Sequence, residues 1–163
     1  MNDDFYTVRG YEMKNYNKNT LTASMEDYLE MISRECAARP FIRVNELAQR
    51  LNVKDSSATK MVQKLGNLGY VDYQKYGMVT LTVKGRELGA FLLERHTLLE
   101  KFLSFIGCTE DALKQTELIE HNISPDTLKN IELLYGFLNE NRDVLKKYHS
   151  YKKAKIHTKQ ARE

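Results

Sequence analysis

The chain has 163 residues, of which 42% are hydrophobic, 29% charged and 10% aromatic, as expected for a soluble globular protein of one domain or two small ones. No apolar run approaches the roughly 18 residues of a membrane-spanning helix, and residues 1–19 lack the apolar core of a secretory signal. The two cysteines, Cys36 and Cys108, are far apart and lack metal-site spacing, which argues against a disulfide scaffold. We therefore expect a cytoplasmic protein.

The formal net charge of +3 conceals three segments of alternating sign. Residues 41–86 contain eight Lys or Arg against three acids, residues 87–132 contain nine acids against four bases, and residues 134–163 contain eight bases against three acids. A basic segment is typical of a protein that binds a polyanion, whereas an acidic segment is either solvated or a cation site. Most such charged segments are merely solvated. The positions of individual residues therefore have to show whether either segment is a binding site.

An apolar pattern of helical period follows a leader, residues 1–21, which shows no sustained period. Ser24 can cap a first helix over residues 25–37. Asn45 can cap a short second helix over residues 46–51, which a turn separates from the next element.

A third helix and a hairpin complete the basic half of the chain. The helix is predicted over residues 56–68, where Gly69 ends it. Two short runs rich in aromatic and β-branched residues, 70–75 and 78–82, predict a β-hairpin. The order helix, short helix, turn, helix, hairpin is that of a winged helix-turn-helix.

The second half of the chain predicts helices only. Thr82 can cap a long helix over residues 83–106, a second helix spans residues 110–122, and Ser124 followed by Pro125 starts a third. A short basic helix is expected after these. The predicted fold class is therefore mainly α, with a small β-hairpin wing in its N-terminal part.

One face of the third helix has the composition of a DNA-reading surface. Ala58, Val62 and Leu65 fall on the other face, together with Met61, and would pack against the neighbouring helices. Lys and Gln can reach base edges in the major groove, while Ser, Thr and Lys hold phosphates. The alternative is an exposed helix of a domain that binds protein. The candidate DNA-binding residues on this face and at the hairpin tip are Ser56, Ser57, Thr59, Lys60, Gln63, Lys64, Lys75 and Tyr76.

A polar cluster interrupts an apolar stripe in the acidic segment. Glu117, Glu120 and His121 stand at positions i, i+3 and i+4, where the stripe that begins at Leu113 would continue. Carboxylate oxygens combined with neutral imidazoles suit Mn(II) or Fe(II), whereas Ca(II) and Mg(II) prefer oxygen alone. The cluster is therefore a candidate metal site, although an acidic pair at this spacing is common in a chain this charged.

Asp27, Glu30 and His96 are weaker candidates for the same site. A helical wheel turns both carboxylates away from the apolar face of the first helix, and Asp27 could instead complete a capping box with Ser24. Glu30 could be solvated. His96 lies among leucines on the long helix, where a histidine is more often a hydrogen-bonded core residue than a ligand.

Taken together, these motifs resemble the diphtheria-toxin-repressor family of metal-dependent regulators, and within it the manganese transport regulator branch. The resemblance extends over about residues 21–138. The matching stretches are residues 24–30, 56–65, 73–76, 81–85, 95–103 and 117–121.

This resemblance implies a domain organisation. A leader, residues 1–21, would precede a winged helix-turn-helix DNA-binding domain at residues 22–86. A helical metal-binding and dimerisation domain would occupy residues 87–145, and a basic tail residues 146–163. The metal would bind between the two domains.

The resemblance also implies a ligand set and a metal. The implied cluster holds two ions per subunit, bridged by Glu30, Glu117 and Glu120. In the iron-sensing branch a Met and a Cys stand in the places of Asp27 and Glu117, so oxygen at both positions favours Mn(II), with Fe(II) as a further candidate. The implied ligands are Asp27, Glu30, His96, Glu117, Glu120 and His121.

The function so implied is a manganese-responsive regulator that represses manganese-uptake genes when Mn(II) is bound. It would act as a homodimer on a palindromic operator in double-stranded DNA, with no small-molecule substrate, no membrane partner and no catalysis. Three alternatives remain open: an iron-responsive regulator of the same family, a metal-independent winged-helix regulator, and a dinuclear metalloenzyme. The winged helix and the lack of a Gly-rich phosphate loop argue against the enzyme.

Overall fold

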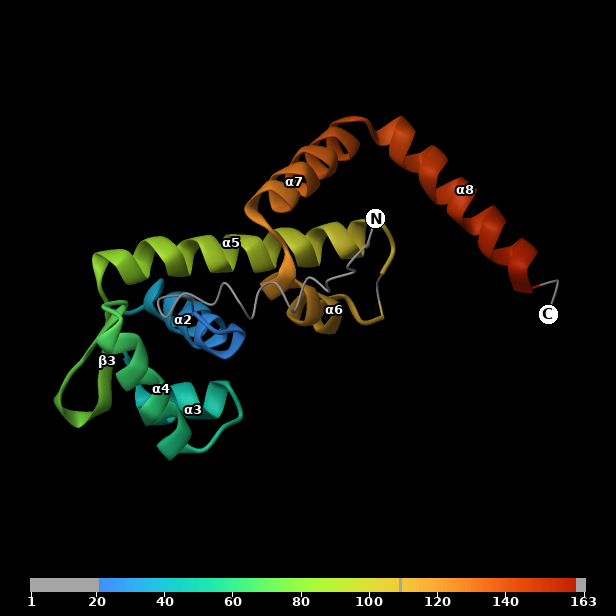
Figure 1. The fold of residues 1–163 in the computed structure, drawn as a ribbon. Coiled ribbons are helices and arrows are strands. Elements are labelled where there is room, and N and C mark those ends of the chain that lie inside the picture. The colour runs from blue at the N-terminus through green and yellow to red at the C-terminus, as the bar shows by residue number, and fades with distance from the viewer. Residues whose placement is uncertain (1–20, 109, 161–163) are drawn as a thin grey trace, which may run out of the picture. The chain divides into compact units, whose positions relative to one another are not determined.

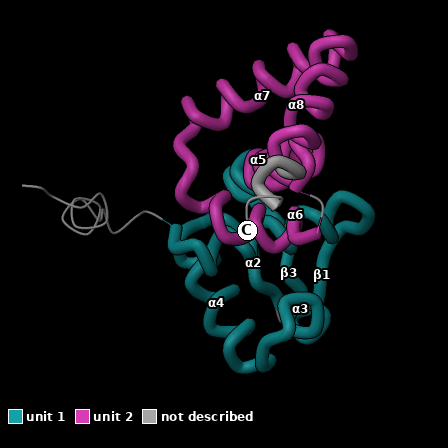
Figure 2. The backbone as a smooth tube through the Cα atoms, turned by 90° about the vertical axis from the view of Figure 1, so that its right-hand side faces the viewer, with its two compact units in different colours: residues 1–90 teal, residues 91–163 magenta. Residues whose placement is uncertain are grey.

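The structure, a computed structural model, describes residues 21–108 and 110–160, and within them the side chains of Lys75 and residues 156–160 are not described. The expected leader, apart from Leu21, lies outside the described residues. The chain forms two compact units, residues 1–90 and 91–163 (Figure 2). The long helix α5 (Val83–Phe105) runs through the boundary (Figure 1). In the described part of the chain, no helix combines the length and the apolar character needed to cross a membrane.

Helices α2, α3 and α4 of the first unit are seen beside strand β3 (Figure 1). This strand is the middle one of a small antiparallel sheet of order β1-β3-β2. This confirms the predicted mainly helical fold with a hairpin. Its elements before α5 are α2 (Ala23–Cys36), β1 (Ile42–Arg43), α3 (Val44–Arg50), α4 (Asp55–Asn67), β2 (Val71–Tyr73), the 3-10 turn η1 (Lys75–Gly77) and β3 (Met78–Leu81).

Two helices of this unit begin two residues earlier than predicted, because other residues cap them. Thr22, rather than Ser24, caps α2, and its hydroxyl accepts a hydrogen bond from the Met25 backbone N–H at 3.3 Å. Arg43, rather than Asn45, is the N-cap of α3, where the Glu46 carboxylate accepts the Arg43 backbone N–H at 3.0 Å. That hydrogen bond, together with the Arg39 guanidinium, lowers the pKa of Glu46.

The core of the first unit gathers apolar side chains from its helices and from all three strands. Ala58, Val62 and Leu65 of α4 are fully buried, which confirms the predicted inner face of this helix, and Met61 is half-buried. Other fully buried side chains are Leu29 and Ile32 of α2, Ile42 of β1, Leu47 and Ala48 of α3 and Val79 of β3.

The predicted hairpin is present, and a third strand joins it. Val71 pairs with Leu81 between β2 and β3, and Ile42 of β1 pairs with Val79 on the other edge of β3. Sequence analysis left β1 out because two residues are too few to show an alternating pattern. At the hairpin tip Tyr76 has φ 64° and Gly77 has φ 73°, both in the left-handed region that closes a tight turn.

Gly85, in the first turn of α5, lies directly against the backbone of Tyr70, the residue before β2. A Cβ at this position would overlap the backbone carbonyl of Tyr70. We expect Gly85→Ala to lower the free energy of unfolding by about 1–3 kcal/mol, as for other overpacked sites, with a lower midpoint in thermal denaturation followed by circular dichroism. Gly66→Ala in α4 is the matched control, because its Cβ would meet only the Val71 carbonyl oxygen at an ordinary 3.5 Å. Equal midpoints for the two variants would contradict this packing.

The regular elements of the second unit, among its described residues, are all helices or 3-10 turns. After the remainder of α5 it contains α6 (Ala112–Ile119), the 3-10 turn η2 (Glu120–Asn122), α7 (Pro125–Glu140) and α8 (Arg142–Gln160). The predicted cap of α7 is confirmed, since the Ser124 hydroxyl accepts the Thr127 backbone N–H at 3.1 Å.

Two predictions for this unit are wrong. The helix predicted over residues 110–122 is divided into α6 and η2, and the terminal helix α8 has 19 residues rather than being short. The period of α6 gave no sign of the division, because a 3-10 turn keeps residues i and i+3 on one side of the chain.

Candidate metal centre and DNA interface

Two imidazoles flank a buried carboxylate in the second unit. Glu120 Oε2 lies 3.0 Å from His96 Nδ1, and Glu120 Oε1 lies 3.8 Å from His121 Nε2. Glu120 and His96 are 2% and 6% exposed, so this cluster is largely shielded from water. When His96 Nδ1 carries the proton and donates to Glu120, the lone pair of the ring lies on Nε2, as in imidazoles that bind metals.

The change from α6 to η2 decides which acid enters this cluster. Glu120 begins the 3-10 turn and is buried, whereas Glu117, one turn earlier on α6, is exposed. Of the sequence-predicted residues in this unit, the structure therefore brings His96, Glu120 and His121 together, and it places Glu117 at the surface.

Arg95 is a member of this cluster that sequence analysis did not single out. Its side chain is 5% exposed, and Nη2 lies 3.4 Å from His121 Nδ1. A buried guanidinium beside the imidazole adds a fixed positive charge near the acidic donors. The only sequence signal was its position directly before His96, because the hydrophobic period of a helix does not predict that an arginine is buried.

The two candidate ligands of the first unit lie on α2. Asp27 is exposed, whereas Glu30 is only 8% exposed, so the alternative that Glu30 is merely solvated is wrong. The Glu30 carboxylate accepts a hydrogen bond from Arg34 Nη2 at 2.9 Å, one turn later on the same helix. A helical wheel uses only the sequence of the helix itself, so it does not predict which of its other faces are covered by the rest of the protein.

The chemistry of these donors fits Mn(II) or Fe(II). His96, Glu120 and His121 offer imidazole nitrogen and carboxylate oxygen within one buried cluster, and Asp27 and Glu30 are carboxylates on α2. This mixture of oxygen and nitrogen without sulfur is the set that these borderline ions prefer.

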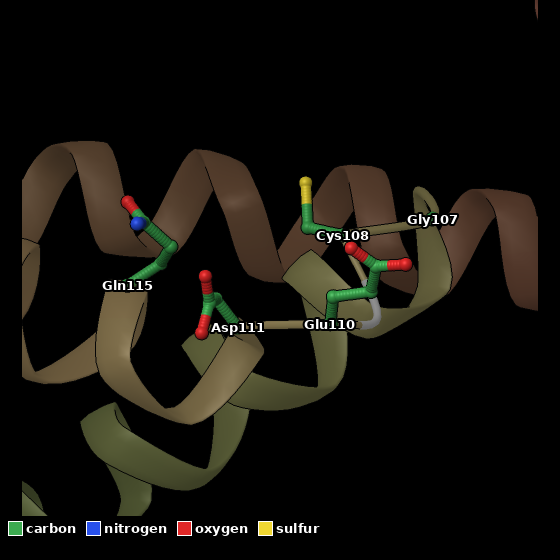
Figure 3. A pocket seen from close by; sticks show the side chains of 5 residues that line it. All are labelled: Gly107, Cys108, Glu110, Asp111 and Gln115. Carbon is green, nitrogen blue, oxygen red and sulfur yellow. The ribbon is translucent and has the colours of Figure 1, made fainter.

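Cys108 does not belong to a metal site among the described residues. It is exposed and lines a pocket of about 330 Å³ together with Gly107, Glu110, Asp111 and Gln115 (Figure 3). Among the described side chains, the groups with three potential ligand atoms close enough for one ion do not include it.

The predicted DNA-reading face of α4 is exposed. Lys60, Gln63 and Lys64 are exposed, as are Ser56 and Ser57. Thr59 is half-buried and donates its hydroxyl hydrogen bond to the Asp55 carbonyl at 2.9 Å. This helix therefore presents a polar outer face over a fully apolar inner one.

The tip of the wing projects from the sheet. Tyr76 is 86% exposed, whereas the side chain of Lys75, the other residue predicted there, lies outside the described residues. Arg43, which sequence analysis did not include, donates from Nη1 to the Tyr76 carbonyl at 3.1 Å. This exposed arginine holds the turn and adds a cation beside it. No sequence signal pointed to Arg43, because its contact spans 33 residues of chain.

Two family descriptions match most of the chain. Residues 20–79 match "Iron dependent repressor, N-terminal DNA binding domain", and residues 82–148 match "Iron dependent repressor, metal binding and dimerisation domain". The chain belongs to the diphtheria-toxin-repressor family. Members of this iron-dependent repressor family are DNA-binding, metal-dependent transcriptional regulators, so the chain is not an enzyme. The resemblance found from the sequence motifs is confirmed.

The chain covers nearly the full length of two related transcriptional regulators. The chain is 44% identical over 132 residues to the HTH-type transcriptional regulator MntR of Lysinibacillus sphaericus (strain C3-41), covering 80% of this chain and 95% of that protein. It is 41% identical over 140 residues to MntR of Listeria monocytogenes serotype 4a (strain HCC23), covering 85% and 99%. A solved structure of the manganese regulator SloR is 28% identical, with a TM-score of 0.62 over 72% of this chain. The chain spans about half of that structure, 55%.

Proposed function

We propose that this chain is a manganese-responsive transcriptional regulator that represses manganese-uptake genes when Mn(II) is bound. The observation that carries the proposal is the buried Glu120 carboxylate between His96 and His121. It occurs in a family with a metal-binding domain, whose members include the transcriptional regulator MntR and the manganese regulator SloR. Such a regulator acts on DNA in the cytoplasm.

The proposed metal site holds two Mn(II) ions per subunit. Its support is the residue type at each position, above all oxygen donors at Asp27 and Glu117, since sulfur there would favour later metals. When bound, the ions neutralise the clustered carboxylates. The proposed ligands are Asp27, Glu30, His96, Glu117, Glu120 and His121.

The proposed active form is a homodimer on a palindromic operator. A dimerisation domain is part of the family description, and α7 exposes Leu133, Leu134 and Phe137, which a second copy could cover. Two recognition helices in a symmetric dimer read half-sites about 34–36 Å apart. The face of α4 proposed to enter the major groove consists of Ser56, Ser57, Thr59, Lys60, Gln63 and Lys64, with Lys75 and Tyr76 of the wing beside it.

Metal and DNA are coupled in this proposal because the proposed ligands come from both parts of the chain. Asp27 and Glu30 belong to the DNA-binding part, and the other four to the metal-binding and dimerisation part. An ion held by both restricts the positions that the recognition helices can take. Such coupling amounts to about 1–3 kcal/mol, or roughly 5–150-fold in affinity.

Fluorescence anisotropy of the DNA upstream of the gene, titrated with protein at one fixed salt concentration, tests this function. Mn(II) is expected to tighten binding tenfold or more, which corresponds to about 1.4 kcal/mol. The salt must be fixed because phosphate contacts alone shift affinity by orders of magnitude. Tight binding to the DNA with the same affinity in the presence and absence of Mn(II) would contradict the proposed metal response.

An iron-responsive regulator is the second candidate, because both matching family descriptions name an iron-dependent repressor. The same titration with Fe(II) under anaerobic conditions separates the two. A stronger effect of Fe(II) than of Mn(II) at equal free concentrations would favour iron.

A further inference from the structure

The last described helix, α8, is strongly basic. Between residues 142 and 160 the sequence contains seven Lys or Arg, two His and a single acid, Asp143. The match to the family description ends at residue 148, so the second half of α8 lies beyond it. What this part of the helix does is therefore not given by the family.

One side of α8 is occupied by contacts within its own unit. Leu145 is 8% exposed. Lys152 Nζ donates to the carbonyls of Ile106 and Gly107 at 2.8 and 2.9 Å, and the Tyr148 hydroxyl donates to the Ile106 carbonyl at 3.3 Å. These carbonyls follow the C-terminal end of α5, where a helix favours a cation. The packed side of α8 is therefore the one that carries Leu145, Tyr148 and Lys152.

The flank of α8 beside those contacts carries a line of cationic and imidazole side chains, which we name the basic stripe. Its members are spaced i, i+4, i+7 and i+11, a spacing that places them on one side of a helix. All of them are exposed. The members of the basic stripe are Arg142, Lys146, His149 and Lys153.

We propose that the basic stripe binds the phosphate backbone of duplex DNA and adds sequence-independent affinity to that of the winged helix. The stripe extends for about 16 Å, a length over which one strand of B-DNA presents roughly five phosphates. Its positive charge complements a polyanion, and the chain already contains a DNA-binding domain. The inference rests on the proposed function as a DNA-binding regulator.

The test compares two double variants of the full chain with equal charge changes. Lys146→Gln/Lys153→Gln removes two cations of the basic stripe, and Lys147→Gln/Lys155→Gln removes two exposed cations from other faces of α8. Binding to a 40-base-pair duplex of arbitrary sequence and to the upstream DNA is measured over a range of salt concentrations. Each lost phosphate contact reduces the slope of log K against log salt by about 0.9, so the stripe variant is expected to lose about 2.

Each outcome decides the proposal. A reduced slope in the stripe variant, with a slope like the parent chain's in the control, supports it. Equal slopes in all three proteins, or no binding of the parent chain to the arbitrary duplex, overturn it. A stripe variant that loses binding to phosphatidylglycerol vesicles but not to DNA also overturns it and assigns the stripe to lipid. If Mn(II) leaves upstream binding unchanged while the slopes differ, the metal response fails and the stripe stands.

Discussion

Glu120→Gln is expected to abolish the Mn(II)-dependent gain in DNA affinity while the helical unit stays folded. The amide keeps the size of the carboxylate. Its oxygen can still accept a hydrogen bond from His96 Nδ1, which lies 3.0 Å from Glu120 Oε2 in the parent chain. It lacks the negative charge that binds the metal, so the whole coupling of roughly 5–150-fold is lost. Glu120→Ala should have the same effect on coupling. Anisotropy titrations with and without Mn(II) measure it, and circular dichroism checks the fold.

Glu110→Gln provides the matched control for that variant. It removes an exposed carboxylate of the same unit that lies outside the proposed ligand set. Its Mn(II) response should equal that of the parent chain. If Glu120→Gln kept the full Mn(II) response, or if both variants lost it equally, Glu120 would not be a ligand.

Lys60→Ala and Gln63→Ala should each weaken binding to the upstream DNA without changing Mn(II) affinity. Both side chains are exposed on α4, opposite the buried Ala58, Val62 and Leu65. A specific contact to a base edge contributes about 1–3 kcal/mol, so each variant is expected to lose roughly 5–150-fold in affinity. Anisotropy on DNA and equilibrium dialysis with Mn(II) measure the two properties separately.

A base contact and a phosphate contact predict different patterns on different DNA sequences. Loss of a base contact weakens binding to the upstream DNA more than to an arbitrary duplex, whereas loss of a phosphate contact weakens both alike. Lys101→Ala, an exposed cation on α5 outside the DNA-binding unit, is the control and should change neither. Unchanged affinity in both α4 variants would remove this helix from the proposed interface.

Local patterns in the sequence were sufficient for the elements that depend on neighbouring residues. The inner face of α4, the Ser124 cap of α7 and the hairpin all follow from residues a few positions apart, and the structure contains each of them. Helical period, capping hydrogen bonds and turn preferences involve residues only a few positions apart, so they can be predicted from one sequence. The spread of family motifs likewise identified the family.

Contacts between distant residues were decided only by the tertiary structure. Strand β1 exists because Ile42 pairs with Val79, and Arg43 reaches the Tyr76 carbonyl across 33 residues. Glu30 and Arg95 are buried although no feature of their helices marks them. Burial of a charged side chain depends on what packs against it and on which partner offsets its desolvation. The hydrophobic period of its own helix predicts neither.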